Sequence, residues 1–376
     1  MIRVRTGIEA VPAYGAGRQG SVDDPANRDL VQLASNESPF PPLPSVRDAI
    51  VRAAAEVNRY PDIDGAVLRA RLADAYGVEV DQIVLGCGSI EVCHQAATVS
   101  AGPGSEVLLA WPTFPEYITI AALTGARARR VPLTKARHDV VAMAEAVTEQ
   151  TRVVFVCNPN NPTGTALTGA ELAYLLDAIP SWCLVVVDEA YAEFAEAPEF
   201  GSALELLGAH ENLLVLRTFS KAYGLAGLRV GYGITSGEVA SLLRLAKIPF
   251  SIGNVALAAA VASIDAGTEL AARVTAMKAE RKRVATQLTG LGWDIPPLQA
   301  NFLWIPAGEA RAAAAVRRCA DSRVLVRHYP DGLRITIGTE EENTRLLDAL
   351  GSPEDLPPTG VGAAAGQPSG SAVERS

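Results

Sequence analysis

The chain has few residues of the kinds that form disulfide frameworks or bind metal ions. Its 376 residues include five cysteines and four histidines. The number of cysteines is odd, the sequence contains no CxxC pair, and the histidines are scattered without the spacing of metal ligands. We therefore expect free thiols in a reducing compartment and no metal site.

Positive charge is also scarce. The formal net charge is −9 and the sequence pI is about 5.1, which argues against nucleic acid as the main partner. No apolar run reaches the length of a membrane span. The first residues, MIRVRTGIEAVPAYG, lack the apolar core of a signal peptide. We expect a cytoplasmic protein that does not enter a membrane.

Hydrophobic residues make up 49% of the chain, enough for a large core. Short apolar or β-branched runs, typical of strands, alternate with amphipathic stretches of helical length. The strand-like runs are QIVLG, EVLLA, ARRVPL, RVVFVC, CLVVVD, NLLVLR and LRVGYGI. This alternation predicts an α/β fold whose large domain contains a mostly parallel sheet covered by helices on both faces.

The pattern changes along the chain and predicts four segments. Residues 1–32 are an irregular arm, and residues 33–254 form the large domain. Residues 255–350 form a smaller α+β domain in which FLWIP, RVLVR and LRITIG are strands. Residues 351–376 are rich in Pro, Gly, Ala and Ser, which predicts a disordered tail.

Chemically capable residues follow the predicted strands, where ligands of open α/β sheets bind. Asp188 ends the run CLVVVD, and Tyr191 comes three residues later. A buried carboxylate there needs a cationic partner, because an unpaired buried charge costs several kcal/mol. The alternative is a carboxylate that caps the next element or pairs with a structural arginine.

Two other turns after strands carry unusual residues. VCNPNNPTG, residues 156–164, combines two prolines with three asparagines and predicts a rigid turn that presents amide groups. GCGSIE, residues 86–91, places glycines and Ser89 at the start of a helix, where backbone N–H groups favour an anion. Taken alone, Ser89 is more typical of an ordinary helix cap than of an anion site.

The stretch TFSKAYGLAGLRVG follows the predicted strand NLLVLR. Thr218 and Ser220 can donate to phosphate oxygens, and Arg229 can pair with them as a charged fork. Lys221 lies between them and is a nucleophile if its pKa is lowered. A solvated lysine and a structural arginine are the alternative. Together the four stretches indicate pyridoxal 5′-phosphate, whose pyridinium pairs with a carboxylate and whose aldehyde condenses with a lysine.

The chain resembles the fold-type I aminotransferases of class I and II. It is most similar to the branch with actinobacterial aromatic amino acid aminotransferases and histidinol-phosphate aminotransferases. The resemblance covers about residues 33–350. It rests on the motifs SNES, NRYPD, NPNNPTG, VDEAY, SKAYGLAGLRVGY and LRITIG, which occur in the order of the family.

The resemblance implies a role for each matching residue on the cofactor side. Lys221 would bind the cofactor and move the substrate proton, and Asp188 would hold the pyridine nitrogen. Asn161 and Tyr191 would donate to the phenolic oxygen of the ring, against which Phe114 would stack. The phosphate would be held by residues of two glycine-rich turns, namely Gly88, Ser89, Thr218, Ser220 and Arg229.

On the substrate side, Arg334 in GLRITIG matches the arginine that binds the α-carboxylate, to which a guanidinium fork is suited. Asn36 of SNES, Tyr14 and Arg327 are further candidates. Tyr60 in NRYPD matches a tyrosine that crosses to the phosphate of a partner subunit. The resemblance therefore implies a homodimer.

We expect transamination of an aromatic L-amino acid, of the phenylalanine type, with 2-oxoglutarate. Histidinol phosphate stays open as the substrate, because Arg327 matches an arginine near the distal substrate group. A threonine-phosphate-type decarboxylase is a further alternative, since the same cofactor can cleave a different Cα bond. A cofactor-binding regulatory protein is disfavoured, because Lys221 and Arg334 are both in place and no basic DNA-binding segment occurs.

Overall fold

The computed structural model describes residues 29–358 together with residues 2, 11 and 27. A seven-stranded sheet has the order β2-β8-β7-β6-β5-β3-β4. Strand β8 runs antiparallel to the other six strands, which are parallel to one another, and this confirms the mostly parallel sheet. Its strands are β2 (Ile83–Gly86), β3 (Glu106–Trp111), β4 (Arg127–Pro132), β5 (Thr151–Cys157), β6 (Leu184–Asp188), β7 (Leu213–Thr218) and β8 (Gly231–Ile234).

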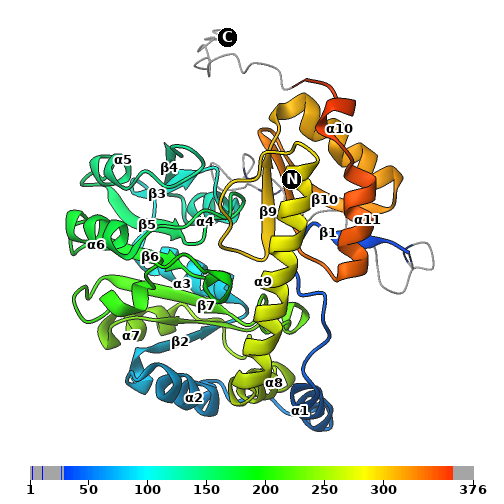
Figure 1. Cartoon of the computed structure of the whole chain (residues 1–376). Helices are drawn as coiled ribbons and strands as arrows, with labels where there is room; N and C mark the ends of the chain where they lie inside the picture. Colours follow the sequence, from blue (N-terminus) through cyan, green and yellow to red (C-terminus); the bar gives the residue numbers. More distant parts are fainter. Residues whose placement is uncertain (1, 3–10, 12–26, 28, 359–376) are drawn as a thin grey trace.

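Helices cover both faces of this sheet because its central strands are apolar on both sides (Figure 1). Val153 and Phe155 pack with one set of helices, and the alternating Val154 and Val156 pack with the other. The first set is α3 (Ser89–Ser100), α4 (Glu116–Thr124) and α7 (Gly237–Leu245). The second is α5 (Val140–Glu145) and α6 (Gly169–Ala178).

A four-stranded sheet of order β1-β10-β11-β9 forms the centre of the smaller unit. Its strands are β1 (Val31–Leu33), β9 (Phe302–Pro306), β10 (Val324–Tyr329) and β11 (Gly332–Thr336). Helices α10 (Gly308–Asp321) and α11 (Glu340–Leu350) pack on it around a separate apolar core. The predicted strands FLWIP, RVLVR and LRITIG are therefore found.

Three segments connect the two units. Strand β1, at the predicted boundary between residues 32 and 33, pairs with β10 of the small sheet. Helix α8 (Asn254–Asp265), assigned by sequence to the small domain, packs instead against α1 (Pro44–Ala54) and α2 (Ala66–Tyr76). The long helix α9 (Gly267–Gly290) runs from this region up to the small sheet (Figure 1). The domain limits remain a prediction. Strand β1 pairs with the small sheet and α8 packs on helices of the large unit, so both elements find their partners across the predicted limits.

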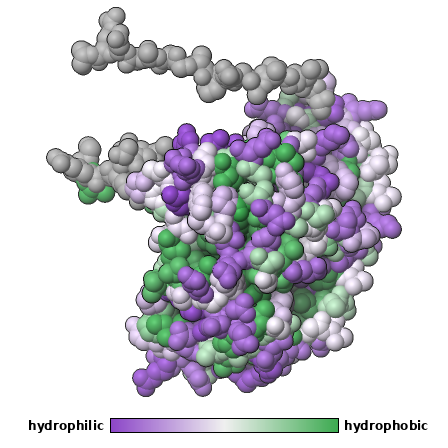
Figure 2. Space-filling model, turned by 90° about the vertical axis from the view of Figure 1, so that its left-hand side faces the viewer, coloured by the Kyte–Doolittle hydropathy of each residue, from purple (hydrophilic) through white to green (hydrophobic). Residues whose placement is uncertain are grey.

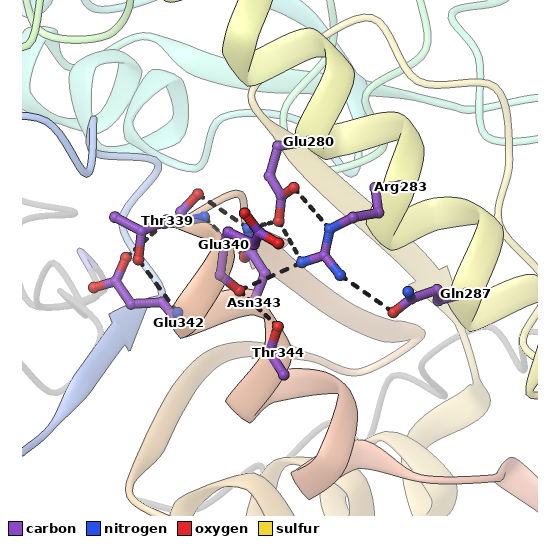
Figure 3. A network of polar contacts seen from close by, with 9 residues as sticks. Glu280, Arg283, Gln287, Thr339, Glu340, Glu342, Asn343 and Thr344 are labelled. Atoms are coloured by element: carbon purple, nitrogen blue, oxygen red, sulfur yellow. Dashed lines mark hydrogen bonds and ion pairs between the residues drawn. The ribbon is translucent and has the colours of Figure 1, made fainter.

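A polar network fixes the turn after β11 to α9 (Figure 3). The buried Asn343 accepts a hydrogen bond from the N–H of Gly338 at 2.9 Å, and its amide donates to Glu280 at 2.8 Å. Glu280 also binds Arg283 on the same helix. Thr339 caps α11. The end of β11, the strand that carries Arg334, is therefore anchored at a defined place.

The first residues of the predicted tail are ordered. Residues 353–355 form a short 3-10 helix, Pro353 is buried, and Leu356 packs on the small core. Trp293 donates to the carbonyl of Gly351 at 2.8 Å. Residues 351–358 therefore contact the small core, which composition alone does not reveal, and the extent of the disordered tail stays a prediction. The rest of the tail lies outside the described residues.

The surface mixes hydrophilic and hydrophobic residues over the face seen in Figure 2. Among the described helices, no single one has the length and apolar character needed to cross a membrane. Helices α8 and α9 satisfy that test only as a pair, by length and composition, and are bent by 83° at their junction.

Candidate functional site

A cavity of about 540 Å³ lies between the two units, at the carboxyl ends of β2, β3, β5, β6 and β7. This is the edge at which ligands of parallel sheets bind. Twelve residues expected in the site line it: Asn36, Ser89, Phe114, Asn161, Asp188, Tyr191, Thr218, Ser220, Lys221, Arg229, Arg327 and Arg334. The fold thus collects side chains from turns far apart in the sequence.

One end of the cavity is suited to an anion. Ser89 begins α3, so the positive end of a helix dipole faces this region. Arg229 donates to Ser220 at 3.2 Å. Gly88 has φ 75°, and a Cβ there would lie 2.4 Å from Nη2 of Arg229. The positive φ favours glycine at this position, and the absence of a Cβ leaves room for the Arg229 guanidinium.

The hydroxyl groups of this end come from the carboxyl end of β7. Thr218 ends the strand, and its hydroxyl accepts a hydrogen bond from the backbone N–H of Ser220 at 3.1 Å. A Cβ on Gly231, which pairs with Thr218, would lie 2.3 Å from the backbone N of Ser89. The two glycine-rich turns can therefore approach each other closely enough to share one anion.

Asp188 lies deeper in the cavity and is buried. Its carboxylate accepts hydrogen bonds from the Tyr117 hydroxyl at 2.8 Å and from the N–H of Ala190 at 3.2 Å. Tyr117 is held in turn by stacking on Phe155, with 4.4 Å between ring centroids. Burial raises the pKa of Asp188, and the Tyr117 hydrogen bond opposes that shift. A cation placed beside Asp188 would favour its ionised form.

Lys221 follows the hydroxyl groups and points into the same cavity. Its Nζ donates to the carbonyl oxygen of Ser35 at 3.2 Å. Burial, assisted by the positive charge of Arg334, lowers the pKa of the Lys221 amine to about 8. About a tenth of this amine is thus unprotonated at pH 7, far more than for an ordinary lysine, and the unprotonated form is what nucleophilic attack requires.

Arg334 reaches the cavity from β11. Its guanidinium donates to Oδ1 of Asn161 at 2.5 Å and to the carbonyl oxygen of Ala34 at 2.5 Å. Because the Asn161 oxygen is engaged, its amide N–H is the group that can donate into the cavity. Nε of Arg334 is buried and has no partner in the described part of the chain. A carboxylate could satisfy it.

Asn36 links this side to Tyr191. Its amide donates to the Tyr191 hydroxyl at 3.0 Å, and its backbone N–H donates to the Thr336 hydroxyl at 2.8 Å. Asn36 has φ 55°, a left-handed conformation that asparagine tolerates better than most residues. The segment after β1 is thereby joined to both units.

Arg327 lies opposite Arg334 on the antiparallel pair β10–β11. Both line the cavity, as does Tyr329, whose hydroxyl lies 3.4 Å from Nη1 of Arg334. Directly paired residues point to the same face of a sheet. Two guanidinium groups therefore line the cavity from the same face of the small sheet.

Three predicted residues are not among the side chains that line the cavity. Gly88 lies next to the guanidinium of Arg229, which itself lines the cavity. Tyr60 is 82% exposed and stacks on Phe250, with 4.7 Å between ring centroids. Tyr14 lies outside the described residues.

Sequence reasoning missed Tyr117. It lies in WPTFPEY only three residues after Phe114 and is fully buried, so its hydroxyl needs a partner. The helical spacing of these two aromatic residues was the available signal, since residues three apart lie on one face. Sequence reasoning also missed the Thr113 hydroxyl, which donates to Asn160 at 2.7 Å and fixes the turn before Asn161.

Comparisons with known proteins agree on one family. The model for "Aminotransferase class I and II" matches residues 28–350. An aromatic amino acid aminotransferase of Streptomyces coelicolor is 45% identical over 347 residues, which are 92% of this chain and 96% of that protein. One of Rhodococcus jostii is 46% identical and covers 92% of this chain and 94% of that protein.

A solved structure of histidinol-phosphate aminotransferase from Sinorhizobium meliloti, in complex with pyridoxal-5′-phosphate, is also similar. Its TM-score is 0.81 at 28% identity, and the match covers 86% of this chain and 90% of that one. The architecture described above is therefore shared with a protein that holds this cofactor.

Proposed function

Because this chain belongs to the class I and II aminotransferases, a pyridoxal-phosphate-dependent family, we propose that it transfers the amino group of an aromatic L-amino acid to 2-oxoglutarate. The observation that carries the proposal is the Lys221 amine, whose pKa is lowered to about 8 in a cavity shared with Asp188 and Arg334. An amine, a carboxylate and a guanidinium arranged in this way suit an amino-acid substrate and an aldehyde cofactor.

The residues fit pyridoxal 5′-phosphate. Gly88, Ser89, Thr218, Ser220 and Arg229 would hold the phosphate at the start of α3. Asp188, whose pKa is raised by burial, would pair with the ring nitrogen, and Phe114 would pack against the ring face. When bound, the cofactor supplies an aldehyde for the amino group and a ring that accepts electrons from Cα.

The remaining side chains bind, orient and move protons. Lys221 would hold the cofactor and then transfer the substrate proton from Cα. Arg334 would bind the α-carboxylate through its fork and, by occupying the oxygen of Asn161, orient the amide N–H toward the cofactor. Tyr191, oriented by Asn36, would donate to the same cofactor oxygen as Asn161.

The aromatic substrate is supported by the relatives that are 43–46% identical and carry that name. The second substrate would be a dicarboxylate. The guanidinium of Arg327 has no hydrogen bond or ion pair within the described residues and lines the cavity beside Arg334, so it is available to a second carboxylate.

Histidinol phosphate is the second candidate. The same free guanidinium of Arg327 would suit its phosphate, and the neighbour from Sinorhizobium meliloti carries that name. In that case Arg334 would serve mainly the dicarboxylate partner, because histidinol phosphate has no α-carboxylate.

The two candidates are separated by a half-reaction on purified protein with bound cofactor. Phenylalanine and histidinol phosphate are added separately, without an oxo acid, while the visible absorbance of the bound cofactor is followed. Rapid loss of absorbance with phenylalanine alone is the expected result. Loss with histidinol phosphate alone would assign the protein to the second candidate, and no cofactor absorbance at all would reject both.

The active form would be a homodimer in which Tyr60 contacts the cofactor phosphate of the partner. Tyr60 is exposed and lies among other exposed apolar side chains on contacting segments, namely Val57, Ile63, Val67, Leu245, Ile248 and Phe250. Sedimentation measures the assembly, and Tyr60→Phe should weaken cofactor binding. A monomer with full cofactor affinity would contradict this. The cytoplasmic location stays a prediction.

A further inference from the structure

Glu91 is a buried carboxylate without a role in the chemistry described so far. It lies in the first turn of α3 and is 7% exposed. Three neutral donors surround it. The backbone N–H of Cys87 donates to Oε2, while the N–H of Ile248 and the hydroxyl of Ser251 donate to Oε1 at 3.2 and 3.1 Å. The two oxygens thus connect two different segments.

One of these segments is the turn that would hold the cofactor phosphate. Cys87 immediately precedes Gly88 and Ser89, and the backbone of Glu91 also donates to the Gly88 carbonyl at 3.2 Å. Glu91 therefore binds this turn twice, through its side chain to Cys87 and through its backbone to Gly88. Moving the carboxylate would change the direction of the N–H groups at the start of α3.

The other segment lies beside Tyr60. Phe250, between Ile248 and Ser251, stacks on the Tyr60 ring. Lys247 donates to the carbonyl of Ile63 at 2.5 Å. Asn254 donates to the carbonyl of Arg59 at 3.2 Å. Most side chains of residues 51–64 are exposed, so the contacts from residues 247–254 contribute to holding Tyr60 in place.

We infer that Glu91 is a positioning residue that couples the phosphate turn of one subunit to the Tyr60 segment that this subunit presents to its partner. The inference rests on the proposed cofactor site and homodimer. The path runs from Cys87 through Glu91 to Ile248 and Ser251, and from Phe250 to Tyr60. Each subunit's own phosphate turn would thereby influence the tyrosine that completes the other site.

Glutamine is a sharp test of this role because it has nearly the same shape. A carboxylate accepts on both oxygens, whereas an amide has one acceptor and one NH₂ donor. In Glu91→Gln, the backbone N–H of either Cys87 or Ile248 would face the NH₂ group of the glutamine, which cannot accept a hydrogen bond. One of the two segments must then lose its anchor.

The experiment is a double-mutant cycle on the dissociation constant of pyridoxal 5′-phosphate, titrated into cofactor-free protein. Protein is kept at a concentration at which sedimentation shows dimers. We expect Glu91→Gln to weaken binding about tenfold and Phe250→Ala about threefold. Because both act on one path, the double variant should be no weaker than Glu91→Gln alone. Effects that multiply to about thirtyfold would overturn the coupling.

Ser251→Ala is a milder second variant, which removes one donor to Oε1 and is expected to weaken binding about twofold to threefold. Glu106→Gln is the matched control, since Glu106 is also buried but begins β3, at the opposite end of the strand from the cavity, where it is bonded to Arg127 and Thr148. It should leave cofactor affinity unchanged even if the melting temperature falls.

The outcomes separate this inference from the proposed function. If the wild-type protein does not bind the cofactor or does not form dimers, the proposed function fails. If the wild-type protein does both, and Glu91→Gln binds the cofactor as tightly as Glu106→Gln does, only the role of Glu91 is rejected.

Discussion

The two sides of the cavity are built in different ways. On the side proposed for the cofactor, Asp188 ends a strand and Ser89 and Lys221 follow strands of the same sheet, so the strand order brings them together. On the substrate side, Arg334 is held by Asn161 and by Ala34, which are 173 and 300 positions away in the sequence. The first side depends on one domain, whereas the second depends on how two domains meet.

This difference predicts that the two sides can be damaged separately. Changes on the cofactor side should affect cofactor binding and the chemical step. Changes on the substrate side should affect the apparent affinity for substrates and leave the cofactor bound.

The largest effect is expected from Lys221→Ala. Removing the amine removes both covalent attachment of the cofactor and the group that moves the substrate proton, so turnover should fall by at least about 10³-fold. Turnover of phenylalanine with 2-oxoglutarate measures this. Lys278→Ala is the control, because Lys278 donates to the Ala195 carbonyl outside the cavity. Near-normal turnover in Lys221→Ala would contradict the assignment.

Next in size is Arg334→Lys. A lysine keeps the charge but loses the planar fork and the contact with Asn161, so KM for both substrates should rise by roughly 10- to 100-fold. Cofactor affinity should change little. Steady-state kinetics and a cofactor titration measure the two quantities. Arg345→Lys is the control, because Arg345 is half-buried on α11 and donates to the Asp29 carbonyl outside the cavity. An equal loss of cofactor affinity would show that the sides are not separable.

The pH dependence of cofactor capture tests the state of Lys221. Its pKa is lowered to about 8, so the reactive amine is the minor form below that pH and the major form above it. The rate at which cofactor-free protein captures pyridoxal 5′-phosphate should rise about tenfold from pH 6 to pH 7 and level off above pH 8. Stopped-flow absorbance measures it. A rate still rising tenfold per unit at pH 9.5 would indicate an ordinary lysine.

The smallest effect is expected from Tyr117→Phe. The change removes one hydrogen bond to Asp188 and keeps the stacked ring, so cofactor affinity should fall about threefold to tenfold. The pKa of Asp188 should rise further, because the Tyr117 hydrogen bond opposes the effect of burial. A cofactor titration at several pH values would detect the loss, which should be larger at low pH. If Tyr117→Phe and the wild-type protein had the same cofactor affinity at all pH values, Tyr117 would have no role in cofactor binding.

The sequence could indicate which residues line the proposed cofactor side of the cavity, because its signals are local. A strand followed at once by a carboxylate, a lysine or a glycine–serine turn is visible in one short window, as at Asp188 and Lys221. The partner of Asp188 was not visible in this way. Tyr117 comes from a helix two strands away in the sheet, and only its burial at that point shows what its hydroxyl binds.

Prediction was weaker where elements cross between the two units. The sequence pattern changes near residue 255, which predicts that the small domain begins there. Helix α8 nevertheless packs its apolar face on α1 and α2 of the large unit. Strand β1 likewise joins β10. A periodic pattern indicates which face of an element is buried, but it does not name the partner.

The sequence by itself determined the alternation of strands and helices, the residues at the strand ends and the family to which the chain belongs. It could do so because side-chain periodicity and turn chemistry act over a few residues. Only the tertiary structure decided that Arg334 orients Asn161, that Tyr117 bonds to Asp188, and that Glu91 joins the phosphate turn to the segment beside Tyr60. Each of these depends on how buried polar groups from distant segments satisfy one another, and that is settled only when the whole chain packs.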